Sequence, residues 1–167
     1  MPIVNDIVLS LGSNIGDRLA NLSLAIDLLR SSEIVSKVVT SSIYESEPVD
    51  EANQANFLNL CLLGKSEHTA LELLGFLKSV EHYVGRQIRK RWHEREIDID
   101  IIFFGDLVIQ SQNLVIPHER MHERRFVLQP LAEILPNQIH PIFGVTVQNL
   151  LEKCSDKSQV KLFKSII

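Results

Sequence analysis

The sequence of 167 residues is long enough to bury one hydrophobic core, so we expect a single domain over residues 1–167. Its composition, 45% hydrophobic and 23% charged with 7 Gly and 6 Pro, excludes a disordered tail, a collagen-like repeat and a disulfide-built mini-protein. No window approaches the ~18 uncharged apolar residues of a spanning helix and the N-terminus lacks an export signal, so we expect a cytoplasmic protein without membrane contact.

Positive charge is concentrated in two segments of a chain whose net charge is −4. Eight of the seventeen Lys and Arg fall within residues 86–95, the basic segment, and residues 120–125. Both are candidates for anion binding, and solvated loops are the alternative. Cys61 and Cys154 stand far apart with no Cys or His at ligand spacing, so we expect reduced thiols without a zinc cage.

Hydrophobic periodicity indicates alternating strands and helices. Apolar β-branched runs bounded by glycine or proline predict strands, and apolar residues at helical spacing predict helices. Thr69 is a candidate N-cap and Gly85 a candidate C-cap. The pattern predicts a strand over residues 7–11, a helix from Asp17, strands over 35–44 and 57–63 separated by a loop over 46–56, a helix between Thr69 and Gly85, a strand over 97–104, and helices over about 124–135 and 147–153.

This order, βαββαβ followed by two further helices, predicts an α+β fold. Both helices of the repeat then lie on one face of an antiparallel sheet, which is the ferredoxin-like architecture. An RNA-binding module of the same architecture is excluded, because its Gly-Phe-Gly-Phe pattern and a basic domain are both missing from the sequence.

Two aspartates on one predicted strand are the strongest chemical signal. Alternation along the strand directs Ile97, Ile99 and Ile101 into the core and Asp98 and Asp100 to the opposite face. Two neighbouring carboxylates repel each other unless a cation lies between them, and oxygen ligands suit Mg²⁺ bound to phosphates. Two exposed aspartates on the polar face of an amphipathic strand are the alternative.

Residues around this pair suggest a phosphorylated, planar ligand. The basic segment ends just before the aspartates and contains Trp92, the only tryptophan, which can stack on a heterocycle. A second polar stretch rich in His and Arg leads into a predicted helix, where Arg124 is well placed for phosphate. Phe57 and Asn59 share a strand face and present a ring beside an amide, although they can equally be ordinary strand residues.

Several motifs, in this order along the chain, resemble 6-hydroxymethyl-7,8-dihydropterin pyrophosphokinase, a family of folate biosynthesis. The likeness covers nearly the whole chain, and its Arg-x-x-Asp-x-Asp and Pro-His…Arg-x-Phe elements are together highly specific. The motifs are Leu11-Gly12-Ser13-Asn14, Tyr44-Glu45-Ser46-Glu47-Pro48, Phe57-Leu58-Asn59, Gly85-Arg86, Arg91-Trp92, Arg95-Glu96-Ile97-Asp98-Ile99-Asp100, and Pro117-His118 through Arg124-Arg125-Phe126-Val127-Leu128.

The resemblance implies transfer of pyrophosphate from ATP to the hydroxymethyl group of the pterin, with release of AMP. It implies that Asp98 and Asp100 hold two Mg²⁺ ions, and that Arg86 and Arg95 act in a mobile catalytic loop. The implied ATP contacts are Glu81, Trp92, Arg95, Ile101, His118 and Arg124, and the implied pterin contacts are Ser46, Val49, Phe57, Asn59, Trp92 and Phe126.

Four features depart from the family's usual pattern: the His93-Glu94 pair, Ile88, Asn113 and Glu119. The partners expected are the two small-molecule substrates, without nucleic acid, and the chain is expected to be a monomer. Another Mg²⁺-dependent nucleotidyltransferase with a strand-borne Asp-x-Asp site is the alternative function, and it would release pyrophosphate instead of AMP.

Overall fold

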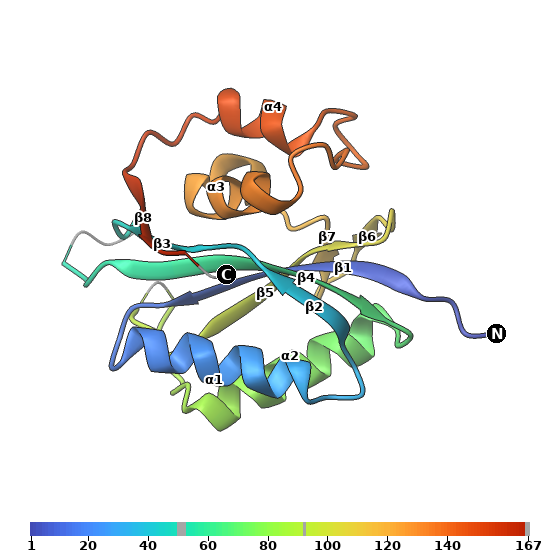
Figure 1. Ribbon diagram of the computed structural model, residues 1–167, viewed down its shortest axis with the longest axis horizontal. Coiled ribbons are helices and arrows are strands. Elements are labelled where there is room, and N and C mark those ends of the chain that lie inside the picture. Colours follow the sequence, from blue (N-terminus) through green and yellow to red (C-terminus); the bar gives the residue numbers. More distant parts are fainter. Residues whose placement is uncertain (50–52, 92, 166–167) are drawn as a thin grey trace.

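A central antiparallel sheet lies between two layers of helices in the computed structural model, which describes residues 1–49, 53–91 and 93–165 (Figure 1). In chain order the elements are β1 (Asn5–Ser13), α1 (Arg18–Arg30), β2 (Ser36–Thr40), β3 (Ile43–Ser46), β4 (Phe57–Ser66), α2 (Ala70–Val84), β5 (Asp98–Phe104), β6 (Ile109–Gln110), β7 (Val115–Ile116), the short 3-10 helix η1 (Met121–Glu123), α3 (Arg125–Ile134), α4 (Val147–Glu152) and β8 (Val160–Lys164).

The strand order in the sheet is β5-β1-β4-β3-β8, and β2 also pairs with β4. Every pairing in the sheet is antiparallel. Helices α1 and α2 cover one face, and α3 and α4 cover the other (Figure 1). The mixed fold with an antiparallel sheet and additional C-terminal helices agrees with the sequence pattern. Among the described residues, no helix has the length and apolar character needed to cross a membrane.

Helix α2 begins and ends where the sequence predicted. Thr69 and Glu72 form a reciprocal capping box, in which the Thr69 hydroxyl accepts from the Glu72 amide at 3.2 Å and the Glu72 carboxylate accepts from the Thr69 amide at 2.7 Å. Gly85 ends the helix in the left-handed region, with φ of 113°, which a residue without Cβ adopts at little cost.

The single strand predicted over residues 35–44 is wrong, because β2 and β3 are separated at Ser41 and Ser42. The Ser41 hydroxyl accepts from the Cys61 amide at 2.9 Å, in place of a regular ladder bond. The Ser42 amide and hydroxyl both donate to Oε1 of Glu133 on α3, at 3.0 and 2.9 Å. The Ser41 amide still donates to the Cys61 carbonyl at 2.8 Å, so polar side chains replace only part of the backbone bonding where the strand is divided.

Strand β5 contributes to both hydrophobic layers. Ile99 and Ile101 of β5, and Ile97 just before it, are buried with α1 and α2, as the alternation predicted. A register shift against β1 next to Leu9 changes the alternation, so that Phe103 packs in the second layer with α3 and α4. The strand is thus fixed from both sides, and its first half directs two carboxylates away from the α1/α2 layer.

Candidate active site

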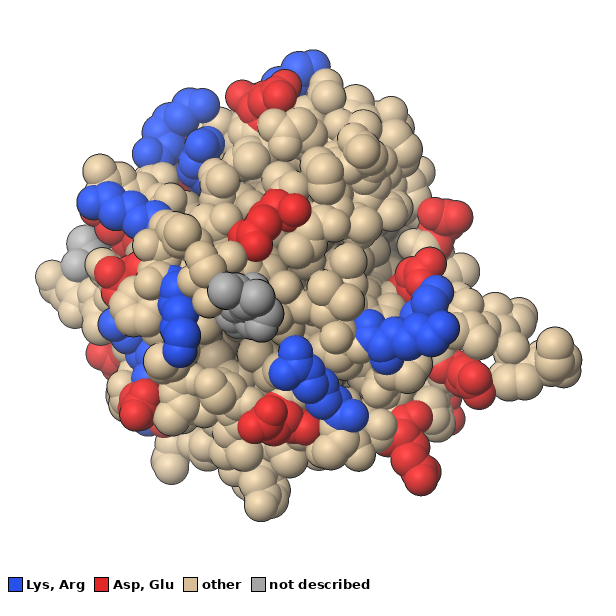
Figure 2. All heavy atoms as spheres, in the orientation of Figure 1, with Lys and Arg blue, Asp and Glu red and all other residues tan. Residues whose placement is uncertain are grey.

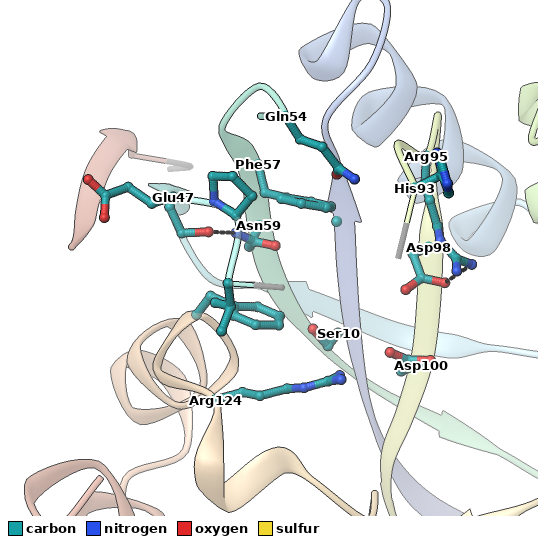
Figure 3. Close-up of a pocket in the computed structure, with 15 residues that line it drawn as sticks. Ser10, Glu47, Gln54, Phe57, Asn59, His93, Arg95, Asp98, Asp100 and Arg124 are labelled. Carbon is teal, nitrogen blue, oxygen red and sulfur yellow. Dashed lines mark hydrogen bonds and ion pairs between the residues drawn. The ribbon is translucent and has the colours of Figure 1, made fainter. Parts of the chain in front are cut away.

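One cavity lies at the end of the sheet where β1, β3, β4 and β5 meet the N-terminus of α3 (Figure 3). An aromatic and amide wall from β4 faces a wall of carboxylates and arginines from β5 and the segment before it. The lining residues are Ser10, Gly12, Ser46, Glu47, Pro48, Val49, Gln54, Phe57, Asn59, His93, Arg95, Asp98, Asp100, Arg124 and Phe126.

Asp98 and Asp100 form the acidic part of the cavity, each with 35% of its side-chain surface exposed. Burial and the neighbouring Asp98 charge raise the pKa of Asp100 to about 7. His118 lies close by, with its Nε2 atom 3.8 Å from Oδ2 of Asp100. Burial, together with the charge of Arg124, lowers the pKa of His118 to about 4, so this imidazole is neutral at physiological pH.

These two carboxylates are suited to Mg²⁺ that also binds a phosphorylated substrate. In the described part of the chain, no three or more His, Cys, Asp and Glu side chains are grouped to hold a metal ion. Mg²⁺ is usually held by one or two carboxylates and completes its shell with water and substrate phosphates, so a third protein ligand is not required. The two aspartates therefore fit the ion that the sequence predicted.

Arg86 links the acidic pair to a buried glutamate. Its Nη1 atom lies 2.6 Å from Oε2 of Glu81 and 2.9 Å from Oδ1 of Asp98. Oε1 of Glu81 accepts from the Ile99 amide at 2.8 Å, between the two aspartates. Burial raises the pKa of Glu81, while Arg86 and the Ile99 amide oppose that shift. Glu81 thus fixes the β5 backbone through the Ile99 amide and does not line the cavity.

The amide and aromatic wall is built around Asn59, which is 2% exposed. Its Nδ2 atom donates to the Ser46 hydroxyl at 2.7 Å, which fixes the orientation of the amide (Figure 3). A Cβ atom at Gly12 would lie 2.9 Å from Oδ1 of Asn59, so only glycine leaves room there. Phe57 from the same strand and Phe126 from α3 supply rings at the cavity. This wall fits a planar group with hydrogen-bonding edges.

The predicted residues separate into four groups. The cavity brings together Ser46, Val49, Phe57, Asn59, Arg95, Asp98, Asp100, Arg124 and Phe126. Arg86 and His118 do not line the cavity but contact Asp98 and Asp100, and Glu81 contacts Arg86. The side chain of Ile101 is buried in the core, and its contact with the nucleotide stays a prediction. Trp92 lies outside the described residues.

Asn14 is the main residue of the site to which sequence reasoning gave no role. It is 2% exposed and follows directly after β1. Oδ1 accepts from the Arg95 amide at 2.8 Å, and the Asn14 amide donates to the Arg95 carbonyl at 3.0 Å. Nδ2 donates to Oε1 of Gln54 at 3.0 Å. One side chain therefore joins Arg95 to the loop that leads to Phe57, and a polar residue just beyond a strand end is the sequence signal for it.

The charge distribution outside the cavity is mixed. On the face shown in Figure 2, Lys and Arg are interspersed with Asp and Glu and form no continuous basic surface. His93, from the basic segment, also lines the cavity. The cavity thus combines local positive charge with two carboxylates inside an acidic protein.

Residues 8–136 match the family described as 7,8-dihydro-6-hydroxymethylpterin-pyrophosphokinase (HPPK). A 2-amino-4-hydroxy-6-hydroxymethyldihydropteridine pyrophosphokinase from Aquifex aeolicus is 44% identical over 137 residues, which cover 82% of this chain and 84% of the relative. The Bacillus subtilis protein of the same name is 44% identical over 126 residues, or 75% of each chain. A Plasmodium falciparum HPPK-DHPS crystal structure aligns with a TM-score of 0.72 at 20% identity, covering 91% of this chain and 44% of that one. This last likeness concerns the fold alone.

Proposed function

Because the chain belongs to the 7,8-dihydro-6-hydroxymethylpterin-pyrophosphokinase family, it is an ATP-dependent pyrophosphokinase of folate biosynthesis, and we propose that the cavity between β4 and β5 is where it acts. The enzyme transfers pyrophosphate from ATP to the hydroxymethyl group of 6-hydroxymethyl-7,8-dihydropterin. The observation that carries the assignment of the site is the cavity's two walls, one suited to a flat heterocycle and one to phosphates.

The pterin is assigned to the β4 wall. Phe57 and Phe126 enclose its ring, while Asn59 hydrogen-bonds its polar edge and is held in place by Ser46. Val49 closes the same side of the cavity. A buried amide with a fixed orientation discriminates by hydrogen bonding, because a ring without the matching donor and acceptor leaves the amide unsatisfied.

The triphosphate is assigned to the β5 wall. Asp98 and Asp100 would hold two Mg²⁺ ions, which supply charge neutralisation for the phosphate oxygens when bound. Arg95 and Arg124 offer guanidinium groups to the same oxygens, and His118 remains neutral beside Asp100. Arg86 holds Asp98 from behind and keeps its carboxylate directed at the cavity. The contacts of Trp92 with ATP and with the pterin stay predictions.

The reaction follows from placing the two substrates on facing walls. The pterin hydroxymethyl oxygen forms a bond to the β-phosphorus of ATP, the bond from that phosphorus to the oxygen bridging to the α-phosphate breaks, and AMP leaves. The hydroxyl proton is released as the new bond forms. The residues of the cavity contribute mainly by alignment and by a fixed positive field, which are the main sources of catalysis in phosphoryl transfer.

We further assign the sheet to the ferredoxin-like arrangement in one domain over residues 1–167. With β2 and β3 counted as one interrupted strand, the order β5-β1-β4-β2/β3 corresponds to the fourth, first, third and second strands of a βαββαβ repeat. The placement of α1 and α2 on one face supports this assignment (Figure 1).

Product analysis tests the proposed function. Incubation with ATP, Mg²⁺ and 6-hydroxymethyl-7,8-dihydropterin should give AMP and the pterin diphosphate in equal amounts, and ATP should persist when either Mg²⁺ or the pterin is left out. ADP as the main product would refute pyrophosphate transfer. Release of pyrophosphate would instead indicate a nucleotidyltransferase.

A further inference from the structure

The N-terminus of α3 forms part of the cavity but receives its cap from a distant segment. Arg124, the N-cap residue, makes no side-chain capping bond, although Arg124 and Phe126 both line the cavity. The first amides of a helix need partners outside it. The Arg125 amide donates to Oδ2 of Asp156 at 3.0 Å, across 31 positions of sequence. The end of α3 that carries two cavity residues is therefore held by the C-terminal segment, residues 156–165.

Asp156 is itself held firmly. Its Oδ1 atom accepts from the Ser158 amide at 2.9 Å and from the Ser158 hydroxyl at 2.6 Å. Partial burial raises the pKa of Asp156, but the bonds from Ser158 and the Arg125 amide outweigh burial and bring the pKa below its usual range. The group is a carboxylate at neutral pH, and a negative charge at a helix N-terminus is favourable.

Strand β8 attaches the same segment to a second element that lines the cavity. It pairs antiparallel with β3, and Val160 lies opposite Ser46, the residue that fixes the Asn59 amide. The C-terminal segment therefore contacts both α3 and β3, and each of these elements contributes residues to the cavity lining. Both attachments come from residues beyond 136, outside the part of the chain that matches the family.

The two adjacent arginines at the start of α3 interact with different groups. Asp156 interacts with the charge of Arg125. Arg124 instead extends from α3 toward Asp100 (Figure 3). Neighbouring residues at a helix start project in different directions, so the orientation of this first turn decides which guanidinium reaches the phosphate wall. Loss of the bond to the Arg125 amide would free the turn to fray and to rotate Arg124 and Phe126 together.

We propose that Asp156 is a positioning residue for pyrophosphate transfer, which fixes Arg124 and Phe126 in the cavity by capping α3. The proposal rests on the proposed function, since it takes Arg124 as a phosphate contact and Phe126 as a pterin contact. It assigns to the C-terminal segment a part in catalysis, although none of its described residues lines the cavity.

Asp156→Ala tests the proposal through steady-state kinetics for both substrates, thermal unfolding and hydrogen exchange. We expect kcat/KM to fall about tenfold for the pterin and for ATP, the scale of losing one hydrogen bond to a charged group. Asp156→Asn keeps one acceptor oxygen for the Arg125 amide but loses the second one and the charge, so it should recover part of the loss and bring kcat/KM to within about threefold of the wild type. The amides of Val127 and Leu128 in the first turn of α3 should exchange faster in Asp156→Ala.

Thr146→Ala is the matched control. Thr146 caps α4, in the same layer, by accepting from the Asn149 amide at 3.1 Å, and it lies outside the cavity lining. Its removal should lower the unfolding temperature by a similar amount and leave kcat/KM unchanged. Equal kinetic losses in the two variants, or wild-type kinetics in Asp156→Ala, would overturn the proposal.

A second variant and a second measurement cover the cases in which Asp156→Ala does not fold or the wild type is inactive. If Asp156→Ala does not fold, Ser158→Ala replaces it and should lower kcat/KM about threefold by loosening the carboxylate; unchanged kinetics would then count against the proposal. If the wild type forms no AMP, the proposed function fails, and hydrogen exchange of α3 still tests the cap. In that case faster exchange in Asp156→Ala but not in Thr146→Ala supports the cap, and equal exchange refutes it.

Discussion

Replacing Asn59 by alanine separates recognition of the pterin from general stability. The variant loses the 2.7 Å bond to Ser46 and leaves a buried serine hydroxyl, 2% exposed, without this partner. Loss of one buried hydrogen-bond partner costs about 1–2 kcal/mol of folding free energy, which corresponds to a fall of about 2–8 °C in Tm for a chain of this size. The same amide is the proposed contact to the pterin edge, so binding should weaken as well.

The pterin should bind ~5- to 150-fold more weakly to Asn59→Ala, equivalent to about 1–3 kcal/mol, because the edge of the ring loses a preoriented partner. The affinity for a non-hydrolysable ATP analogue should stay within about twofold of the wild type, since the amide lies on the opposite wall from Asp98 and Asp100. Calorimetric titration with each ligand measures both affinities.

Ser41→Ala is the control for stability alone. Ser41 is fully buried in the same sheet, its hydroxyl accepts from the Cys61 amide at 2.9 Å, and it does not line the cavity. The Ser41→Ala variant should have a lower Tm and an unchanged affinity for the pterin. A role of Asn59 in pterin recognition would be refuted if Asn59→Ala lost affinity for both ligands equally. It would also be refuted if Ser41→Ala weakened pterin binding as much as Asn59→Ala does.

Three other predictions concern the phosphate wall and the segment before it. Asp98→Asn and Asp100→Asn should each lower turnover by ~10²-fold or more in an AMP-release assay while Tm changes little, and near-normal turnover at modest Mg²⁺ would remove that residue from the metal site. Arg95→Ala should lower turnover by ~10²–10³-fold with a smaller change in pterin affinity, and the basic segment should gain hydrogen-exchange protection when MgATP analogue and pterin bind; protection already high in the free protein would exclude a closing lid. The hydrogen bond from Arg89 lowers the pKa of Glu96 to about 2, so its stabilisation is complete above the usual value of 4.5 and is lost as pH falls through about 2; urea unfolding of Glu96→Gln should show a weaker pH dependence in that window, and an unchanged dependence would contradict the prediction.

Local signals predicted the elements well, and long-range hydrogen bonds account for what the sequence pattern missed. Helix α2 followed from Thr69 and Gly85 because capping depends on residues within a few positions. The interruption between β2 and β3 depends on Glu133, 91 positions after Ser42, and composition alone cannot indicate such a partner. Strand β8 was not predicted, since its pairing with β3 is set by the tertiary fold.

In the candidate site too, local spacing predicted some features and long-range contacts set the others. The spacing of Asp98 and Asp100 on a strand predicts their shared face from geometry alone, and the structure places both at the cavity. The same alternation buries the Ile101 side chain, as the sequence predicted, and the contact of Ile101 with ATP stays a prediction. Asn14 has partners 40 and 81 positions away, which explains why a sequence pattern gave it no role.

The bonds of Asn14 also bear on how this enzyme can change in evolution. A single amide holds the backbone of Arg95 and the side chain of Gln54, so the two loops share an attachment. A substitution that reshapes the pterin side near Gln54 will shift the reference position from which Arg95 is placed. We therefore expect epistasis between the loops: the effect of a change in one will depend on the sequence of the other, and altered substrate preference will require paired substitutions.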